Sequence, residues 1–406
     1  MKASSCRDRL EQALARIADP KGEGARACLS IYAAAARGAA DAADARGERG
    51  ESLGPLDGAI VSVKDLFDVA GEPTRAGSKI LAEEAAPAAA DAPVVQRLRR
   101  AGAVIVAKTN MSEFAFSGIG ANPHFGTPGN PHDRQRAPGG SSAGAPVAVA
   151  DGMCEISIGT DTGGSVRVPA ALCGLVGFKP SRQRVPTEGA FPLSKTLDSI
   201  GPIALAGLRF GIAEGLPLGG LDDTVAPAFA KAIGRLDDAG VRISRETLSS
   251  LDDMMAVNDR GGVVPPEACA LHRDRLRRRA ADVDPNVRVR IERGCGVGEA
   301  DYADILRERT RLVSIMDTRL KDLDVLVMPT CAIVAPVLAD LADAKAFAAR
   351  NAAVLRNTSI INFFDLCAIS LPLSAALPVG LMLVARNGHD RQLLRIAAAV
   401  APLLGA

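Results

Sequence analysis

The chain has 406 residues, of which 48% are hydrophobic and 23% are charged, and its formal net charge at pH 7 is +1. This length allows two or three domains or one large α/β domain with an extensive core. The near-zero net charge and the scarcity of aromatic residues argue against a nucleic-acid-binding protein, because such proteins present basic surfaces and stack bases on aromatic rings.

Helices and strands are predicted to alternate along the first half of the chain. Leu10, Leu14 and Ile17 recur on one face of a helix over residues 7–18. The alanine-rich residues 29–48 favour a second helix that runs into a polar loop, and the apolar run 59–63 predicts a strand that ends directly on Lys64. The elements expected next are a helix at 92–101, a strand at 103–107, a helix at 142–152, a strand at 154–160 and a helix opening near 165.

The second half continues the alternation. It contains a strand-like run at 208–213, helical patterns at 223–239 and 300–321, apolar strands at 324–329, 366–372 and 379–385, and a last helix at 390–404. Strands that alternate with helices are typical of an α/β architecture with a largely buried, mixed or parallel sheet.

The termini and the cysteines bear on the compartment. The first twelve residues are polar and charged, and no apolar run has the length of a membrane span, so we expect a cytoplasmic protein without a membrane partner. The eight cysteines occur singly and form no C-x-x-C pair, so no zinc site is expected.

Two glycine turns carry serines close together, Gly139-Gly140-Ser141-Ser142 and Gly163-Gly164-Ser165. Either turn alone is more simply explained by glycine allowing a positive φ and serine capping the next helix. Neither turn fits a phosphate-binding loop, and Ser165 lacks the G-x-S-x-G pattern of a nucleophile elbow. The four histidines (124, 132, 272 and 389) lie in loop, turn or helical contexts that suit surface or capping roles better than catalysis.

The two turns and Lys64, taken together, favour nucleophilic catalysis without histidine. The order strand, GTDTGGS, helix places Ser165 at a sharp turn, where the backbone N–H groups of residues Thr162, Gly163 and Gly164 can form an oxyanion hole. Lys64 can act as the base if desolvation lowers its pKa, and Ser141 can relay the proton between Ser165 and Lys64.

These segments resemble the amidase signature family. The resemblance rests on GGSS followed by G-x-D-T-G-G-S, with Ser165 24 positions after Ser141, and on "GPLDGAIVSVKDLFDVAG" around Lys64. Further matching segments are "GAVIVAKTNMSEFAFSGIGANPHFGTPGNP", "GLVGFKPSRQRVP", "LDSIGPIA" and "NFFDLCAISLP". The resemblance covers residues 50–205 strongly and the C-terminal third moderately.

The resemblance implies a single α/β/α layered domain around a large mixed sheet, comprising an N-terminal helical segment (1–50), a signature core (50–205) and the remainder (206–406). It also implies hydrolysis of a small carboxamide through a seryl acyl-enzyme, with Ser165 as nucleophile, Ser141 as relay behind a cis Gly140–Ser141 peptide, and Lys64 as base. No metal or organic cofactor is expected, and a homodimer is a candidate assembly.

The same resemblance assigns roles to several other residues. Met111, Phe116 and Ser142 are candidates for the substrate pocket, although core packing explains the first two equally well and helix capping explains the third. Asp161 and Arg167 are expected to pair and hold the turn, while Lys108 and Lys179 are expected to be structural.

Departures from the family pattern include Ala143, Gln183 and the short stretches at 204–208 and 373–378. Two alternatives stay open: a glutaminase subunit of a tRNA-dependent amidotransferase and an inactive binding protein on the same fold. The sequence does not distinguish aliphatic, aryl, indole, urea-like and carbamate substrates.

Overall fold

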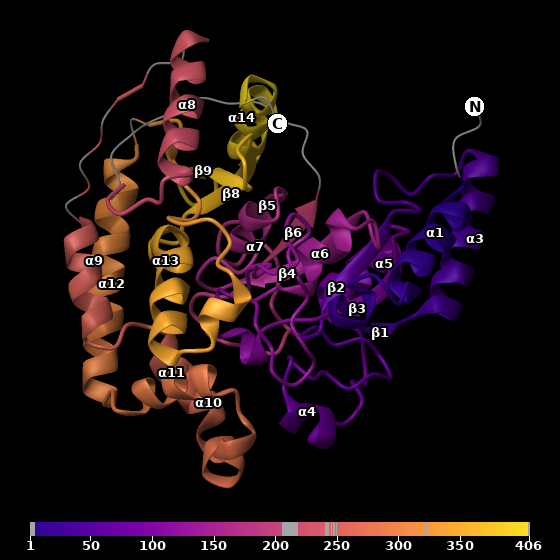
Figure 1. The fold of residues 1–406 in the computed structure, drawn as a ribbon, viewed down its shortest axis with the longest axis horizontal. Helices are drawn as coiled ribbons and strands as arrows, with labels where there is room; N and C mark the ends of the chain where they lie inside the picture. The colour runs from indigo at the N-terminus through magenta and orange to yellow at the C-terminus, as the bar shows by residue number, and fades with distance from the viewer. Residues whose placement is uncertain are drawn as a thin grey trace.

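A computed structural model describes residues 5–204, 218–239, 243, 244, 246, 248, 250–321 and 323–404. In these residues nine strands form one mixed sheet in the order β1-β3-β2-β4-β6-β5-β8-β9-β7. Their bounds are β1 Cys28–Ile31, β2 Ile60–Lys64, β3 Val104–Thr109, β4 Ile156–Asp161, β5 Val176–Lys179, β6 Ser199–Ala204, β7 Leu326–Pro329, β8 Cys367–Leu373 and β9 Val379–Ala385. The large mixed sheet with helices around it confirms the predicted fold class (Figure 1).

Helices cover both faces of the sheet. Along β9, Leu381 and Leu383 pack in one hydrophobic cluster with α8 (Val225–Asp238) and α14 (Asp390–Leu404). Met382 and Val384, whose side chains alternate with them, pack in another with residues of α9 (Ser250–Asp259), α12 (Glu299–Arg319) and α13 (Ala344–Phe363). This alternation shows a strand buried on both faces, which explains its continuous apolar sequence.

The remaining helices surround the first half of the sheet and one end of the second. They are α1 Cys6–Ala18, α2 Gly24–Ala27, α3 Ala33–Arg49, α4 Lys79–Glu84, α5 Pro93–Arg100, α6 Gly144–Ala150, α7 Arg167–Leu172, α10 Val264–Arg279 and α11 Pro285–Cys295. Figure 1 shows α1 and α3 at one end of the molecule and α9 and α12 at the opposite end.

Most of the predicted elements occur near their expected positions. The helix expected at 29–48 is confirmed as α3, but its predicted start is wrong. Residues Cys28–Ile31 form the edge strand β1, which pairs antiparallel with β3, and the helix begins only at Ala33. The strands β5 and β6 and the helices α2, α4, α9, α10 and α11 were not predicted, and α13 was expected only in its alanine-rich first half, up to residue 353. The strand expected at 208–213 lies outside the described residues.

The sheet brings the two halves of the candidate site to one edge. Strands β2 and β4 are parallel neighbours, so their carboxyl ends lie at the same edge of the sheet. Lys64 is the last residue of β2, and the turn that carries Ser165 follows Asp161, the last residue of β4.

Candidate active site

Lys64 is fully buried and makes two hydrogen bonds to hydroxyl groups. Its Nζ lies 2.7 Å from Ser141 Oγ and 2.9 Å from Thr160 Oγ1. Burial lowers the pKa of Lys64 to about 7, although Asp198 and Asp161 act in the opposite direction. A large share of the amine is therefore neutral near pH 7 and able to accept a proton.

Ser141 lies in the first glycine turn, directly before α6. The Gly140–Ser141 peptide bond is cis, which confirms the prediction made from the resemblance. The Ser141 side chain is buried and its hydroxyl contacts Lys64, so the structure brings the predicted relay and the predicted base together.

The turn that carries Ser165 is held by a buried ion pair, as predicted. Arg167 donates from Nη2 to Asp161 Oδ1 at 2.8 Å and from Nε to Oδ2 at 3.0 Å, and both side chains are fully buried. Burial alone would raise the pKa of Asp161, but the Arg167 guanidinium outweighs this effect and lowers the pKa to about 2. Gly164 has φ +133°, and a Cβ there would lie 2.1 Å from Thr358 Oγ1, so the turn requires glycine.

The backbone donors of this turn are not equivalent. The N–H of Gly164 donates to Asp161 Oδ1 at 2.9 Å and is therefore already engaged. The N–H groups of Thr162, Gly163 and Ser165 have no hydrogen-bond acceptor within the described part of the chain. Of the N–H groups expected to bind an oxyanion, that of Gly164 is therefore engaged, while those of Thr162 and Gly163 are not.

Ser165 borders a small cavity of about 110 Å³. Its side chain is 4% exposed, and in the described structure its hydroxyl makes no hydrogen bond to Ser141. The cavity is also lined by Ala115, Phe116, Ser117, Thr162, Gly163, Leu193, Val264, Pro265, Arg290, Leu355 and Ser359. The predicted nucleophile therefore borders a cavity that can hold a small ligand.

The three residues assigned to the pocket from sequence lie in different surroundings. Phe116 lines the cavity, whereas Met111 packs in the hydrophobic cluster behind it. Ser142 is fully buried beside Gly159 of β4, and its hydroxyl has no hydrogen-bond partner in the described residues. Met111 and Ser142 therefore do not border the cavity, because the backbone directs both side chains into the packed interior.

Two polar residues near Lys64 were not found by sequence reasoning. Thr160 contacts the amine directly, and Asp198 accepts a hydrogen bond from Thr162 Oγ1 at 2.5 Å. Burial raises the pKa of Asp198 to about 6, against the hydrogen bonds that it accepts. The segment "LDSIGPIA" contains Asp198, so the resemblance included this residue without indicating its role.

The two lysines that were expected to have structural roles donate hydrogen bonds to backbone carbonyl oxygens. Lys179 donates to the carbonyl oxygens of Pro180 and Leu366 at 2.8 and 2.9 Å, and Lys108 donates to that of Pro73 at 3.3 Å. In the described residues no group of histidine, cysteine or acidic side chains is placed to hold a metal ion. No helix in the same residues is long and apolar enough to cross a membrane.

The sequence pattern of the Amidase family matches residues 8–206 and 204–394, which together span most of the chain. The chain belongs to the amidase family. It is an amide-hydrolysing enzyme, in agreement with its similarity to named hydrolases and amidases of this family.

Among its relatives, this amidase is 36% identical to 2-amino-5-chloromuconic acid deaminase from Comamonas testosteroni, over 92% of this chain and 87% of the relative. It is 33% identical to a component of the 1-carboxybiuret hydrolase from Pseudomonas sp. strain ADP, over 82% and 80%. The A-type component of the glutamyl-tRNA(Gln) amidotransferase from Anaeromyxobacter dehalogenans is 46% identical, but over only 50% of this chain and 41% of that protein.

Solved structures agree with this assignment. A crystal structure of an amidase superposes with a TM-score of 0.86 at 33% identity and covers 99% of this chain and 97% of that one. A chain from a protein complex described as revealing the evolutionary origins of an s-triazine catabolic enzyme superposes with a TM-score of 0.87 at 30% identity, over 98% of this chain and 94% of that one.

Proposed function

We propose that this amidase cleaves the C–N bond of a small carboxamide through a seryl acyl-enzyme, with Ser165 as nucleophile, Ser141 as proton relay and Lys64 as base. The observation that carries the proposal is the 2.7 Å contact between Ser141 and a fully buried Lys64 whose pKa is lowered to about 7. A buried amine beside a hydroxyl, with no tightly paired carboxylate, has the properties of a general base.

The proton movements of the proposed reaction balance. Ser165 Oγ forms a bond to the carbonyl carbon while its proton passes to Ser141 Oγ and the Ser141 proton passes to Lys64 Nζ. The tetrahedral intermediate collapses, the C–N bond breaks, and the nitrogen leaves as ammonia or amine after receiving the proton from Lys64 through Ser141. Water then attacks the acyl-enzyme by the same proton route and releases the carboxylate.

The oxyanion of the intermediate is expected to bind backbone N–H groups in the turn before the nucleophile. Thr162, Gly163 and Ser165 supply N–H groups that lack acceptors within the described residues, whereas the N–H of Gly164 is held by Asp161. Donors fixed by the fold stabilise developing charge without reorganisation. The Asp161–Arg167 pair supports this arrangement because it fixes the backbone on both sides of Ser165.

The glutaminase component of an amidotransferase is a second candidate function, supported by the similarity to the A-type components of glutamyl-tRNA(Gln) amidotransferases. Such a component would transfer ammonia to a partner. Turnover of an amide by the purified chain alone would favour the independent hydrolase, and its absence until a partner is added would favour the amidotransferase component.

The experiment that tests the nucleophile combines a variant with covalent labelling. Ser165→Ala should abolish turnover and leave the fold intact, because it removes the atom that bonds the acyl group. A fluorophosphonate should give one adduct, located by mass spectrometry on the peptide that contains Ser165. An adduct on another residue, together with normal turnover in Ser165→Ala, would refute the mechanism.

A further inference from the structure

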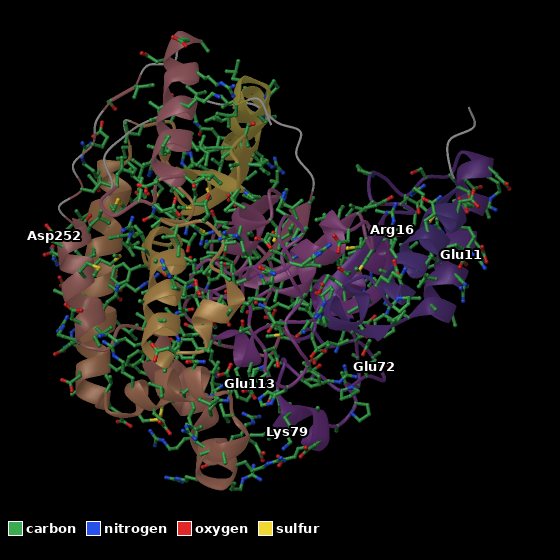
Figure 2. The ribbon with its side chains drawn as sticks, in the orientation of Figure 1. Glu11, Arg16, Glu72, Lys79, Glu113 and Asp252 are labelled. Atoms are coloured by element: carbon green, nitrogen blue, oxygen red, sulfur yellow. A yellow bond between two sulfur atoms is a disulfide. The ribbon has the colours of Figure 1, made fainter. Side chains whose placement is uncertain are left out.

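The helical hairpin formed by α10 and α11 contributes one wall of the cavity at Ser165. Val264 and Pro265 of α10 and Arg290 of α11 line this cavity. The hairpin is fixed to the first half of the chain, because Glu113 accepts a hydrogen bond from the backbone N–H of Asp284 and Lys79 donates to Asp282 at 2.9 Å (Figure 2). Arg290 therefore lies on a helix, α11, whose position is fixed relative to the first half of the chain.

Arg290 is the unusual residue of this wall. It is half-buried, its Nε is buried without a hydrogen-bond partner, and it forms no ion pair with any carboxylate in the described part of the chain. Its neighbours differ: Arg288 lies 3.8 Å from Glu292, and Arg279 pairs with several acidic residues. Desolvating a guanidinium without an anion is unfavourable, so an unpaired arginine beside a catalytic cavity calls for a ligand.

The Phe116 ring fixes the position of the guanidinium. Arg290 Cζ lies 4.5 Å from the centroid of this ring, which also lines the cavity. Stacking uses the flat face of the guanidinium and leaves its N–H donors, which lie in the plane, for an anion. A carboxylate matches the fork of these donors with two parallel hydrogen bonds.

The surroundings of Arg290 are positively charged. An adjoining cavity of about 230 Å³ is bordered by Arg293. The lining residues that it shares with the first cavity are Thr162, Gly163, Val264, Pro265 and Ser359. No acidic side chain lines either cavity in the part of the chain that the structure describes. Burial and the neighbouring Arg293 lower the pKa of Arg290 to about 10, which leaves the guanidinium charged at neutral pH.

We propose that Arg290 determines specificity by binding a carboxylate of the substrate, so that the preferred substrates are short amides that carry a second, ionised carboxyl group. This inference rests on the proposed function, since it places the anion beside the carbonyl that Ser165 attacks. The small volume of the cavity restricts the acyl portion to a few carbon atoms.

Succinamate and succinamide provide a matched test, because they differ only in a carboxylate against a neutral carboxamide. The wild-type protein should show a larger kcat/KM for succinamate. In Arg290→Met, the ratio of the two kcat/KM values should fall by about 10- to 100-fold, the range expected for losing hydrogen bonds to a charged group. Arg290→Lys should give an intermediate ratio, because it keeps the charge and loses the planar fork.

The control is Arg288→Met, which removes an arginine of the same helix that does not line the cavity and should leave the ratio unchanged. Circular dichroism and thermal melting show whether each variant folds. An unchanged ratio in folded Arg290→Met and Arg290→Lys would overturn the proposal.

A binding measurement separates this proposal from the proposed chemistry. Calorimetric titration of succinate into Ser165→Ala should show binding that weakens by about 10- to 100-fold when Arg290→Met is added. Succinate binding that depends on Arg290, together with a wild-type protein that hydrolyses no amide, would support the anion site and contradict the proposed hydrolysis. Amide hydrolysis without such binding would contradict the anion site alone.

Discussion

The amine of Lys64 has a local environment that can be tested through pH. Because burial lowers its pKa to about 7, the neutral fraction grows as pH rises through 7. Turnover should therefore increase through this range and reach a plateau at alkaline pH. Lys64→Arg should be inactive at every pH, because a guanidinium keeps its proton. Steady-state rates between pH 5 and about 10 check both expectations.

Lys64→Ala serves as the companion variant, since it removes both the base and the charge. Both substitutions should leave Ser165 and its turn in place. Near-normal turnover in Lys64→Arg would make Lys64 an electrostatic anchor, and the base would have to be found elsewhere.

The charge of Asp198 acts on the pKa of Lys64, although no sequence motif links the two residues. An ionised Asp198 raises the pKa of Lys64, and Asp198 itself has a pKa raised by burial to about 6. Asp198→Asn removes this negative charge, so the pKa of Lys64 should fall and the acidic limb of the pH–rate profile should move to lower pH.

The pH–rate profile is the decisive measurement. A purely structural effect of Asp198→Asn would lower the rate at every pH without moving the acidic limb of the profile. Asp252→Asn, on an exposed part of α9 (Figure 2), is the matched control and should change neither quantity. A limb that moves to higher pH would reverse the assigned sign and refute the coupling.

At the scale of elements, a disulfide joins α10 to the end of α11. Cys269 and Cys295 are bonded across a sequence separation of 26. Closing a loop of this length stabilises the folded state by roughly 3 kcal/mol in the chain-entropy description. Reduction should therefore lower the midpoint of urea unfolding and, because both helices line the cavity, raise KM.

The double variant Cys269→Ser/Cys295→Ser should show the same midpoint with and without reductant. The six other cysteines are buried and free, so a further shift in that variant would show that reduction acts elsewhere. Disulfides are rare in cytosolic proteins, and this bond therefore bears against the cytoplasmic location expected from sequence.

The sequence predicted the elements whose pattern is local. Strands β2 and β3 are largely apolar up to Val63 and Ala107, as parallel neighbours buried on both faces require, whereas β4 alternates Ile with Ser and Gly over residues 156–159. By contrast, β6 contains proline, and the second half of α13, beyond the alanine-rich stretch that ends at residue 353, buries Asn357 and Asn362 among its apolar residues, which interrupts the helical period. The sequences of α10 and α11 are rich in charged residues, so no apolar pattern indicates which side of these helices faces the cavity.

The same distinction separates the residues of the candidate site. Lys64, Ser141 and Ser165 lie in short motifs that are recognisable by themselves. Asp198 and Arg290 are distant in sequence and reach the site only through the sheet and the helical hairpin, so no spacing pattern could indicate them. The sequence also could not predict that the N–H of Gly164 donates to Asp161, because this hydrogen bond depends on the detailed conformation of the turn.

At the scale of the whole molecule, the sheet joins the two halves of the sequence. Strand β5 pairs with β6 on one side and with β8 on the other, so the first half continues directly into the second. Helix α13 also supports the turn at Ser165: Thr358 and Ser359 donate to the carbonyl of Gly163, and Arg167 donates to Asn362 Oδ1 at 2.5 Å. The homodimer stays a prediction that light scattering can test.

This continuity predicts how a divided chain behaves. A fragment of residues 1–210 should not fold alone, because β5 would lose β8 and present an unpaired edge, and the turn at Ser165 would lose its support from α13. Co-expression with residues 211–406 should restore a soluble complex and amide hydrolysis, while Ser165→Ala in the first fragment should abolish that activity. Size-exclusion chromatography and activity assays measure both outcomes. A fragment 1–210 that unfolds cooperatively by itself would show instead that the chain contains two independent domains, against the single domain that the resemblance implies.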